Sequence, residues 1–137
     1  KLLEEGNLFD ALKHLTTQMR SSTDTQLTCE IIGTAYDLPP HVENHLLRIG
    51  QEALTNAVKY AYASEIHTEL VYEETQCILR VKDDGRGFDV GQVSLEQGFG
   101  LLGMSERAEQ IRGELLIQSQ PGQGTEVVVI VNRESRL

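Results

Sequence analysis

The sequence predicts an α+β fold in two layers, in which helices cover one face of a mixed, mostly antiparallel sheet. Three observations support this prediction: helix-spaced apolar stripes alternate with short strand-like runs, two pairs of these runs are joined by short turns, and the length of 137 residues fits a single domain. Strands joined by such short turns pair antiparallel. Elements in this order pack most simply as one sheet beneath one layer of helices.

Each element has its own local signal. Pro39-Pro40 breaks the chain and starts the longest expected helix, because proline is tolerated in a first helical turn. Gly113 is well placed to end the last helix. The expected helices are Leu8–Met19, His41–Ala61 and a segment from Leu101 to about Ile111, and the expected strands are Leu27–Ala35, Ile66–Tyr72, Cys77–Lys82, Leu115–Ser119 and Thr125–Val131.

The composition excludes several classes of protein. The formal net charge is −9, and nucleic-acid binding relies on Lys and Arg to neutralise phosphates, so we expect no nucleic-acid partner. No apolar run approaches the roughly 18 residues that a membrane span needs. Cys29 and Cys77 lie far apart in apolar stretches, which indicates free thiols in a reducing, cytoplasmic compartment.

The longest expected helix carries a polar face beside its apolar stripe. Glu52, Asn56 and either Lys59 or Tyr60 follow one another at spacings of three and four residues. An amide oxygen can bind Mg²⁺, a carboxylate can position or deprotonate a water or hydroxyl, and an ammonium can meet a phosphate. On its own the pattern more often marks the solvated side of an amphipathic helix.

Three Gly-x-Gly elements follow, and one alone is weak evidence because turns need glycine. Asp83 comes directly after an expected strand and precedes Gly85 and Gly87. A carboxylate can accept a hydrogen bond from an exocyclic amine such as that of adenine, and glycines let a flat ring approach the backbone. This context favours a nucleotide site at the end of that strand.

The other two Gly-x-Gly elements lie beside a helix and a strand. Gly98 and Gly100, with Leu101, open the last expected helix, where backbone N–H groups and the helix dipole can hold phosphates. Thr125 follows the third element and either bonds near an adenine or simply begins a strand. The chain contains neither a GxxxxGK[ST] loop nor a GxGxxG after a first strand, which disfavours the two commonest nucleotide-binding folds.

Taken in order, four segments closely resemble the catalytic ATP-binding domain of sensor histidine kinases. These kinases belong to the Bergerat-fold (GHKL) ATPases, with DNA gyrase, heat-shock chaperones and mismatch-repair ATPases. The stretch Gly100–Ala108 resembles the subfamily paired with response regulators that have helix-turn-helix outputs. The resemblance spans about residues 39–131, which would be the motif-bearing core of the domain. The four segments are Gln51–Ala61, Asp83–Phe88, Gly98–Met104 and Gly122–Thr125.

The resemblance implies that the domain binds Mg-ATP and donates its γ-phosphate to a histidine on a separate dimerisation domain. Asn56 would coordinate Mg²⁺, and Asp83 would bind the adenine amine. Glu52 matches the position that activates water in ATP-hydrolysing relatives, and its role here stays open. The other implied contacts are Lys59 at a phosphate, Tyr60 where relatives often carry His, Gly85, Gly87 and Phe88 around adenine, Gly98, Gly100 and Leu101 at the phosphates and the hinge of a short lid (Asp89–Gln97), and Thr125 on the adenine side.

No histidine of the chain fits the phosphoacceptor that such a kinase needs. In the resembled subfamily an acidic residue follows the acceptor directly, and none of His14, His41, His45 and His67 has one. We expect the first three at solvated helix positions and His67 on the outward side of a strand. The acceptor would lie on a dimerisation domain outside this chain, with residues 1–25 as the helix and loop leading from it.

We therefore expect a monomeric isolated domain within a homodimeric kinase that acts on a cognate response regulator and is cytoplasmic or membrane-anchored. Three alternatives remain. One is a serine kinase of the anti-sigma-factor type on the same fold. The second is a module that binds nucleotide without transferring phosphate, which the presence of Asn56, Asp83 and every glycine element disfavours. The third is an α+β binding domain with coincidental glycines, which four motifs in order disfavour.

Overall fold

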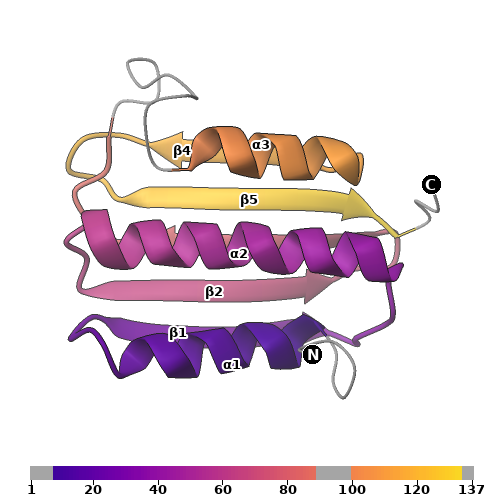
Figure 1. Cartoon of the computed structure of the whole chain (residues 1–137), viewed down its shortest axis with the longest axis horizontal. Coiled ribbons are helices and arrows are strands. Elements are labelled where there is room, and N and C mark those ends of the chain that lie inside the picture. The colour runs from indigo at the N-terminus through magenta and orange to yellow at the C-terminus, as the bar shows by residue number, and fades with distance from the viewer. Residues whose placement is uncertain (1–7, 89–99, 134–137) are drawn as a thin grey trace.

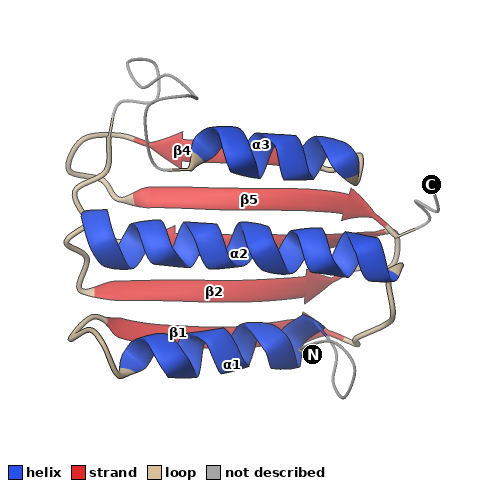
Figure 2. Cartoon of the chain, viewed as in Figure 1, coloured by secondary structure: helices blue, strands red, loops and turns tan. Residues whose placement is uncertain are grey.

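The computed structural model describes residues 8–88 and 100–133, and there it confirms the two-layer α+β architecture. A five-stranded mixed sheet has the order β1-β2-β3-β5-β4, and the helices lie together over one of its faces (Figure 1, Figure 2). The elements are α1 (Leu8–Arg20), β1 (Gln26–Gly33), α2 (Pro40–Tyr60), β2 (Glu65–Tyr72), β3 (Gln76–Asp83), α3 (Leu101–Gln110), β4 (Glu114–Ser119) and β5 (Thr125–Asn132).

The described strands pair as the turn lengths predict. β2 and β3 form one antiparallel hairpin, and β4 and β5 form the other. β3 also pairs antiparallel with β5, whereas β1 runs parallel to β2. The β3–β5 register places Asp83, the last residue of β3, opposite Thr125, the first residue of β5. Two polar residues from distant segments are thus neighbours on the helix-covered face.

One strand boundary predicted from the sequence is wrong. β1 ends at Gly33 rather than continuing to Ala35. Gly33 has φ +88°, a left-handed conformation that glycine adopts readily and that ends an extended strand. The chain also passes so close to β2 that a Cβ on Gly33 would lie 2.2 Å from the carbonyl oxygen of Tyr72. Packing against the neighbouring strand therefore sets this boundary.

The long helix α2 lies over the middle of the sheet, between α1 and α3 (Figure 1). It begins at Pro40, and the carbonyl of Pro39 accepts hydrogen bonds from the N–H groups of Val42 (2.9 Å) and Glu43 (3.1 Å). The predicted apolar stripe is buried against the sheet and the flanking helices. Its members are Leu46, Ile49, Ala53, Ala57 and Ala61.

The opposite face of the sheet carries charged side chains. Nε2 of His67 lies 2.8 Å from Glu30, and Arg80 pairs with Glu69 (2.8 Å) and Glu126 (3.2 Å). The prediction that His67 points outward from its strand is confirmed. Partly solvated pairs of this kind contribute about 0–1 kcal/mol each, so they mark the solvated side of the sheet rather than a source of stability.

Two expectations from composition can be compared with the structure. Cys29 and Cys77 are both free thiols, and burial raises the pKa of Cys77 to about 12, so this thiol stays protonated near neutral pH. Among the described residues, none of the helices has the length and apolar character of a membrane span.

Candidate nucleotide-binding site

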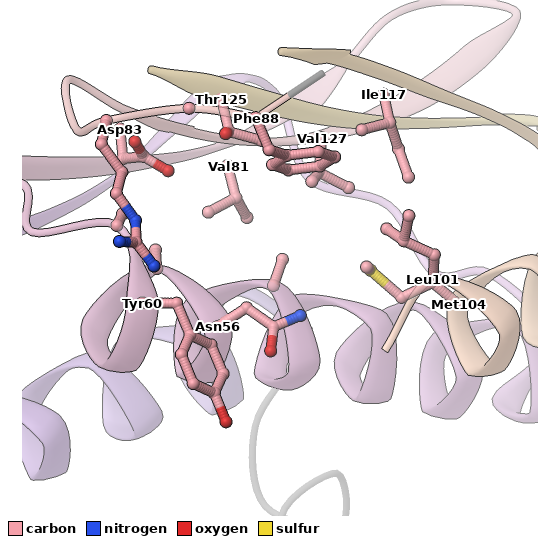
Figure 3. A pocket seen from close by; sticks show the side chains of 15 residues that line it. Asn56, Tyr60, Val81, Asp83, Phe88, Leu101, Met104, Ile117, Thr125 and Val127 are labelled. Carbon is pink, nitrogen blue, oxygen red and sulfur yellow. The ribbon is translucent and has the colours of Figure 1, made fainter. Parts of the chain in front are cut away.

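A pocket opens between α2, α3 and the inner face of the sheet (Figure 3). Its space is about 520 Å³, a volume that includes the open mouth. Large residues pack under the first half of α2, whereas the small side chains of Ala53, Ala57 and Ala61 leave space under the second half. The lining residues are Ala53, Asn56, Ala57, Tyr60, Ala61, Val81, Asp83, Arg86, Gly87, Phe88, Leu101, Met104, Ile117, Thr125 and Val127.

Asp83 provides a buried carboxylate at one end of the pocket. Its side chain is at the end of β3, the residue is 5% exposed, and Oδ1 accepts a hydrogen bond from the Gly85 N–H at 2.8 Å. Burial raises the pKa of Asp83, and hydrogen bonds from the backbone of Gly85 and Thr125 partly oppose that rise. A carboxylate held this way is a directed hydrogen-bond acceptor in an otherwise apolar slot.

The next residue, Asp84, makes different contacts. It is exposed, and its Oδ1 accepts the N–H groups of Ser64 (2.8 Å) and Glu65 (3.0 Å) at the start of β2. Hydrogen bonds from the backbone of Glu65 and Ser64 lower the pKa of Asp84. Asp83 thus lines the pocket while Asp84 fixes the loop to the sheet.

Gly85 lets that loop lie directly on the end of α2. A Cβ at this position would lie 2.2 Å from the carbonyl oxygen of Ala61, so no larger residue fits without movement. The next residue, Arg86, donates its N–H to the same carbonyl at 2.7 Å. Gly85 therefore supports the pocket from behind, whereas Gly87 lines it.

A chain of hydrogen bonds ties the pocket loop to the β4–β5 hairpin. The Phe88 N–H donates to Oγ of Ser119 at 2.8 Å, and that oxygen lies 2.7 Å from the hydroxyl of Thr125. Thr125 thus both begins β5 and lines the pocket. Ser119 was missed in the sequence, where it is simply the last residue of a strand.

The structure gathers most of the predicted site residues into this pocket. Figure 3 shows Asp83 at one end and Leu101 and Met104 at the other, with Asn56 and Tyr60 along α2 between them. Lys59 is exposed and does not line the pocket. The predicted residues that do line it are Asn56, Tyr60, Asp83, Gly87, Phe88, Leu101 and Thr125.

Two predicted residues lie beside the pocket rather than in it. Gly100 is the N-cap of α3, and the carboxylate of Glu52 lies against it: a Cβ on Gly100 would be 2.3 Å from Oε2 of Glu52. Gly98 and the expected lid, Asp89–Gln97, lie outside the described residues.

The apolar wall of the pocket was not found in the sequence, although strand alternation carries the signal. Val81 is two residues before Asp83 and Val127 two after Thr125, so each shares the inward face of its strand. Arg86 was also missed: it lines the pocket, and its guanidinium lies 4.8 Å from the ring centre of Tyr62. The site is therefore a flat apolar slot with a buried acceptor at one end, an amide along its side and a helix N-terminus at the other.

A two-layer fold with such a slot between its layers has the form of a nucleotide-binding domain, because a planar base fits the slot and phosphates fit the helix N-terminus. The chain belongs to the family described as histidine kinase-, DNA gyrase B-, and HSP90-like ATPases, whose model matches residues 41–135.

The chain is also similar over most of its length to named signalling proteins. The chain is 35% identical over 130 residues to the signal transduction histidine-protein kinase/phosphatase DegS of Brevibacillus brevis, covering 94% of this chain and 33% of that protein. It is 32% identical over 127 residues to the sensor protein VraS of Staphylococcus epidermidis, covering 93% and 36%. The chain thus spans about a third of the length of these relatives.

Solved structures show the same fold. The histidine kinase domain of the blue-light activated kinase EL346 of Erythrobacter litoralis superposes with a TM-score of 0.79 at 18% identity, covering 92% of this chain and 61% of that one. The histidine kinase AdeS of Acinetobacter baumannii gives 0.73 at 12% identity, covering 93% and 64%. At these identities the likeness concerns the fold alone.

Proposed function

We propose that this chain is the catalytic ATP-binding domain of a two-component sensor kinase and donates the γ-phosphate of Mg-ATP to a histidine on a separate dimerisation domain. The observation that carries the proposal is the arrangement of Asp83, Asn56 and Leu101 along one pocket, in the order that adenine, metal and phosphates require. Family membership and the names of the relatives support it.

Adenine binds at the Asp83 end of the slot. The buried carboxylate accepts a hydrogen bond from the exocyclic amine, and the inward valines of β3 and β5 contact the ring. The Thr125 hydroxyl, oriented by Ser119, lies on the same side. Tyr60, 45% exposed on α2, contacts the nucleotide from the mouth.

The phosphates lie between Asn56 and the start of α3. Asn56 is the hard oxygen donor that α2 offers to the pocket, which suits Mg²⁺ because this ion usually keeps several waters and binds few protein ligands. When bound, Mg²⁺ would neutralise the charge on the transferring phosphate. Gly98, Gly100 and the N-terminus of α3 donate to phosphate oxygens, and the exposed ammonium of Lys59 reaches a phosphate from outside.

The described histidines are poorly placed to accept the phosphate. His14 and His41 are exposed on helices, and His67 lies on the opposite face of the sheet. His45 differs from the prediction of a solvated residue: α3 packs beside it, and its Nδ1 lies 3.4 Å from Arg107. None of the four lines the pocket. A histidine on another domain accounts for the activity.

The domain organisation follows from this. Residues 1–25 lead from the dimerisation and phosphoacceptor domain, and residues 39–131 form the catalytic core. The full-length kinase is a homodimer that phosphorylates its response regulator, whereas the isolated domain is a monomer. The catalytic domain works in the cytoplasm, where ATP and the regulator are available.

A phosphorylation experiment tests the proposal. The chain is mixed with a separately purified phosphoacceptor domain of its kinase and radiolabelled Mg-ATP. We expect labelled acceptor whose phosphate is lost in acid and kept in base, as for phosphohistidine. Acid-stable label would instead support a serine kinase, and nucleotide binding without any label would support a module that binds without transferring.

A further inference from the structure

A cluster of one imidazole and two carboxylates lies on the face of the sheet that the described helices leave uncovered (Figure 2). It consists of Glu30 on β1 and of His67 and Glu69 on β2. The parallel register pairs Glu30 with Glu69, and His67 shares the face of Glu69 because the two are two residues apart on one strand. One ligand atom from each residue lies within 4.8 Å of those of the other two. Two neighbouring strands thus bring three metal-ligand groups together.

Both carboxylates of the cluster face the same ring nitrogen. Nε2 of His67 lies 2.8 Å from Oε1 of Glu30 and 3.3 Å from Oε2 of Glu69. A ring nitrogen carries at most one proton, which it can donate well to only one of the two carboxylates. Like charges at directly opposed strand positions also repel each other. The protein groups alone therefore satisfy this cluster incompletely, whereas a divalent cation in place of the proton would accept an electron pair from all three.

Neighbouring side chains orient these groups. Nδ1 of His67 lies 2.5 Å from the hydroxyl of Thr28, its partner residue in β1, which turns Nε2 toward the carboxylates. The other oxygen of Glu69, Oε1, accepts a hydrogen bond from Arg80 at 2.8 Å. Outer contacts of this kind orient metal ligands, and an imidazole that binds metal through one nitrogen donates the N–H of the other to an oxygen. Ligand groups and supporting contacts are therefore both present.

We propose that Glu30, His67 and Glu69 bind a divalent transition-metal ion of the zinc class, which links β1 to β2. Imidazole nitrogen suits Zn²⁺ and its neighbours in the first transition row, whereas Mg²⁺ selects oxygen ligands. Three protein ligands leave a position for water, and the side chains of His67 (39% exposed) and Glu30 (53% exposed) are open to solvent. The site is separate from the proposed Mg²⁺ position at Asn56, because the sheet lies between them.

Metal binding at this position would be coupled to the stability of the sheet edge. β1 is an edge strand of the sheet, and β2 is the strand with which it pairs. Because each strand supplies a ligand, the site exists only while the two strands pair in this register. An ion that binds the folded chain and not the unfolded chain raises the free energy of unfolding. Zn²⁺ should therefore stabilise the chain.

Isothermal titration of the chain with ZnCl₂, in a buffer that contains excess Mg²⁺, tests the proposal. We expect one saturable site in the wild type. His67→Gln and Glu30→Gln should each lower Zn²⁺ affinity about ten-fold or more, because losing even an outer partner of a metal ligand costs about 10–100-fold. The matched controls are His14→Gln and Glu65→Gln, at exposed positions of α1 and β2, and both should keep the wild-type affinity.

Two further measurements separate this site from other donors. Zn²⁺ should raise the Tm of the wild type and of both controls, but not that of His67→Gln or Glu30→Gln. Unchanged ATP affinity in Mg²⁺ shows that these two variants fold. The Co²⁺-loaded chain should lack the intense thiolate charge-transfer absorption that binding through Cys29 or Cys77 would give.

Four results would each overturn the inference. These are the absence of saturable Zn²⁺ binding in the presence of Mg²⁺, wild-type Zn²⁺ affinity in either ligand variant, a Tm that Zn²⁺ leaves unchanged in the wild type, and thiolate absorption in the Co²⁺ form. None of them bears on the proposed function, because the nucleotide pocket lies on the other side of the sheet.

Discussion

Asp83 lies directly opposite Thr125 in the β3–β5 pairing, and both residues line the same pocket. The pairing sets this relationship, because partners across an antiparallel ladder point to the same face of the sheet. Ser119 connects this pair to the pocket loop, because its hydroxyl bonds to the hydroxyl of Thr125 and accepts a hydrogen bond from the N–H of Phe88. The adenine end of the proposed site is therefore built on rigid strands, and substitutions there should act on binding more than on folding.

Asp83→Asn should weaken ATP binding about ten-fold or more, because a hydrogen bond to a charged group contributes about 1.5–3 kcal/mol. Isothermal titration calorimetry measures the change. Inosine triphosphate, which lacks the exocyclic amine, should bind the wild type weakly and lose little further in the variant. Asp84→Asn is the matched control, since Asp84 is exposed and bonds to the start of β2. An Asp83→Asn affinity within a few-fold of wild type would show that the adenine assignment is wrong.

The same carboxylate should make nucleotide binding depend on pH. Burial raises the pKa of Asp83, so it takes up a proton at a higher pH than an ordinary aspartate. A protonated carboxyl accepts the amine poorly, and ATP affinity should therefore fall as the pH falls through that raised pKa. ATP affinity is measured in parallel for wild type and Asp83→Asn between pH 4 and 8, so that the variant corrects for the protonation of ATP itself. Curves of identical shape for the two proteins would contradict the prediction.

The contribution of Asp83 to folding stability should depend on pH in the opposite sense to its contribution to ATP binding. Because the folded-state pKa is raised, the folded protein holds this proton more tightly than the unfolded chain does. The contribution of Asp83 to stability is therefore greatest below the ordinary value of 3.8 and is lost as the pH rises through the folded pKa. Asp83→Asn should remove this loss, and urea unfolding of both proteins at several pH values measures the difference.

Asn56→Ala should separate metal-dependent from metal-independent binding. If Asn56 coordinates Mg²⁺, the variant should lose most of the gain in ATP affinity that Mg²⁺ gives to the wild type, while adenosine binds both proteins within about two-fold. Titrations of ATP and adenosine with and without Mg²⁺ measure the four affinities. An equal loss for ATP and adenosine would rule out the metal role. Thr55→Ala serves as the control, because the neighbouring Thr55 lines a separate cavity between α2 and α3 rather than the nucleotide pocket.

The sequence predicted the elements well because the signals for them are local. The apolar stripe of α2, the proline pair before it and the short hairpin turns depend on neighbouring residues alone. The end of β1 was missed because it depends on the close approach of Gly33 to Tyr72 on another strand. Apolar spacing along one segment contains no information about that contact.

The candidate site shows the same difference between local sequence signals and contacts that depend on distant segments. Asp83 and Asn56 stand out by residue type, but Val81 and Val127 become one wall only because β3 pairs with β5. The sequence placed Glu52 and Asn56 together on one helical face. In the structure the start of α3 lies against Glu52, so that Asn56 lines the nucleotide pocket while Glu52 lines a separate cavity between α2 and α3. Which residues share a cavity depends on packing between segments that are distant in the chain.

Gly85→Ala should destabilise the fold by about 1–3 kcal/mol, the usual cost of forcing extra volume into a packed site. The new Cβ would lie 2.2 Å from the carbonyl oxygen of Ala61, and backbone atoms on both sides would have to move. Gly103→Ala is the matched control: apart from the adjoining backbone of its own helix, nothing lies within 4 Å of the added Cβ, and alanine in a helix should stabilise by up to about 1 kcal/mol. Urea unfolding gives both free energies. Because the loop moved by the substitution also carries Asp83 and Gly87, ATP affinity should fall in Gly85→Ala and stay unchanged in Gly103→Ala. Equal stability of the two variants would mean that the loop does not pack on the end of α2 as described.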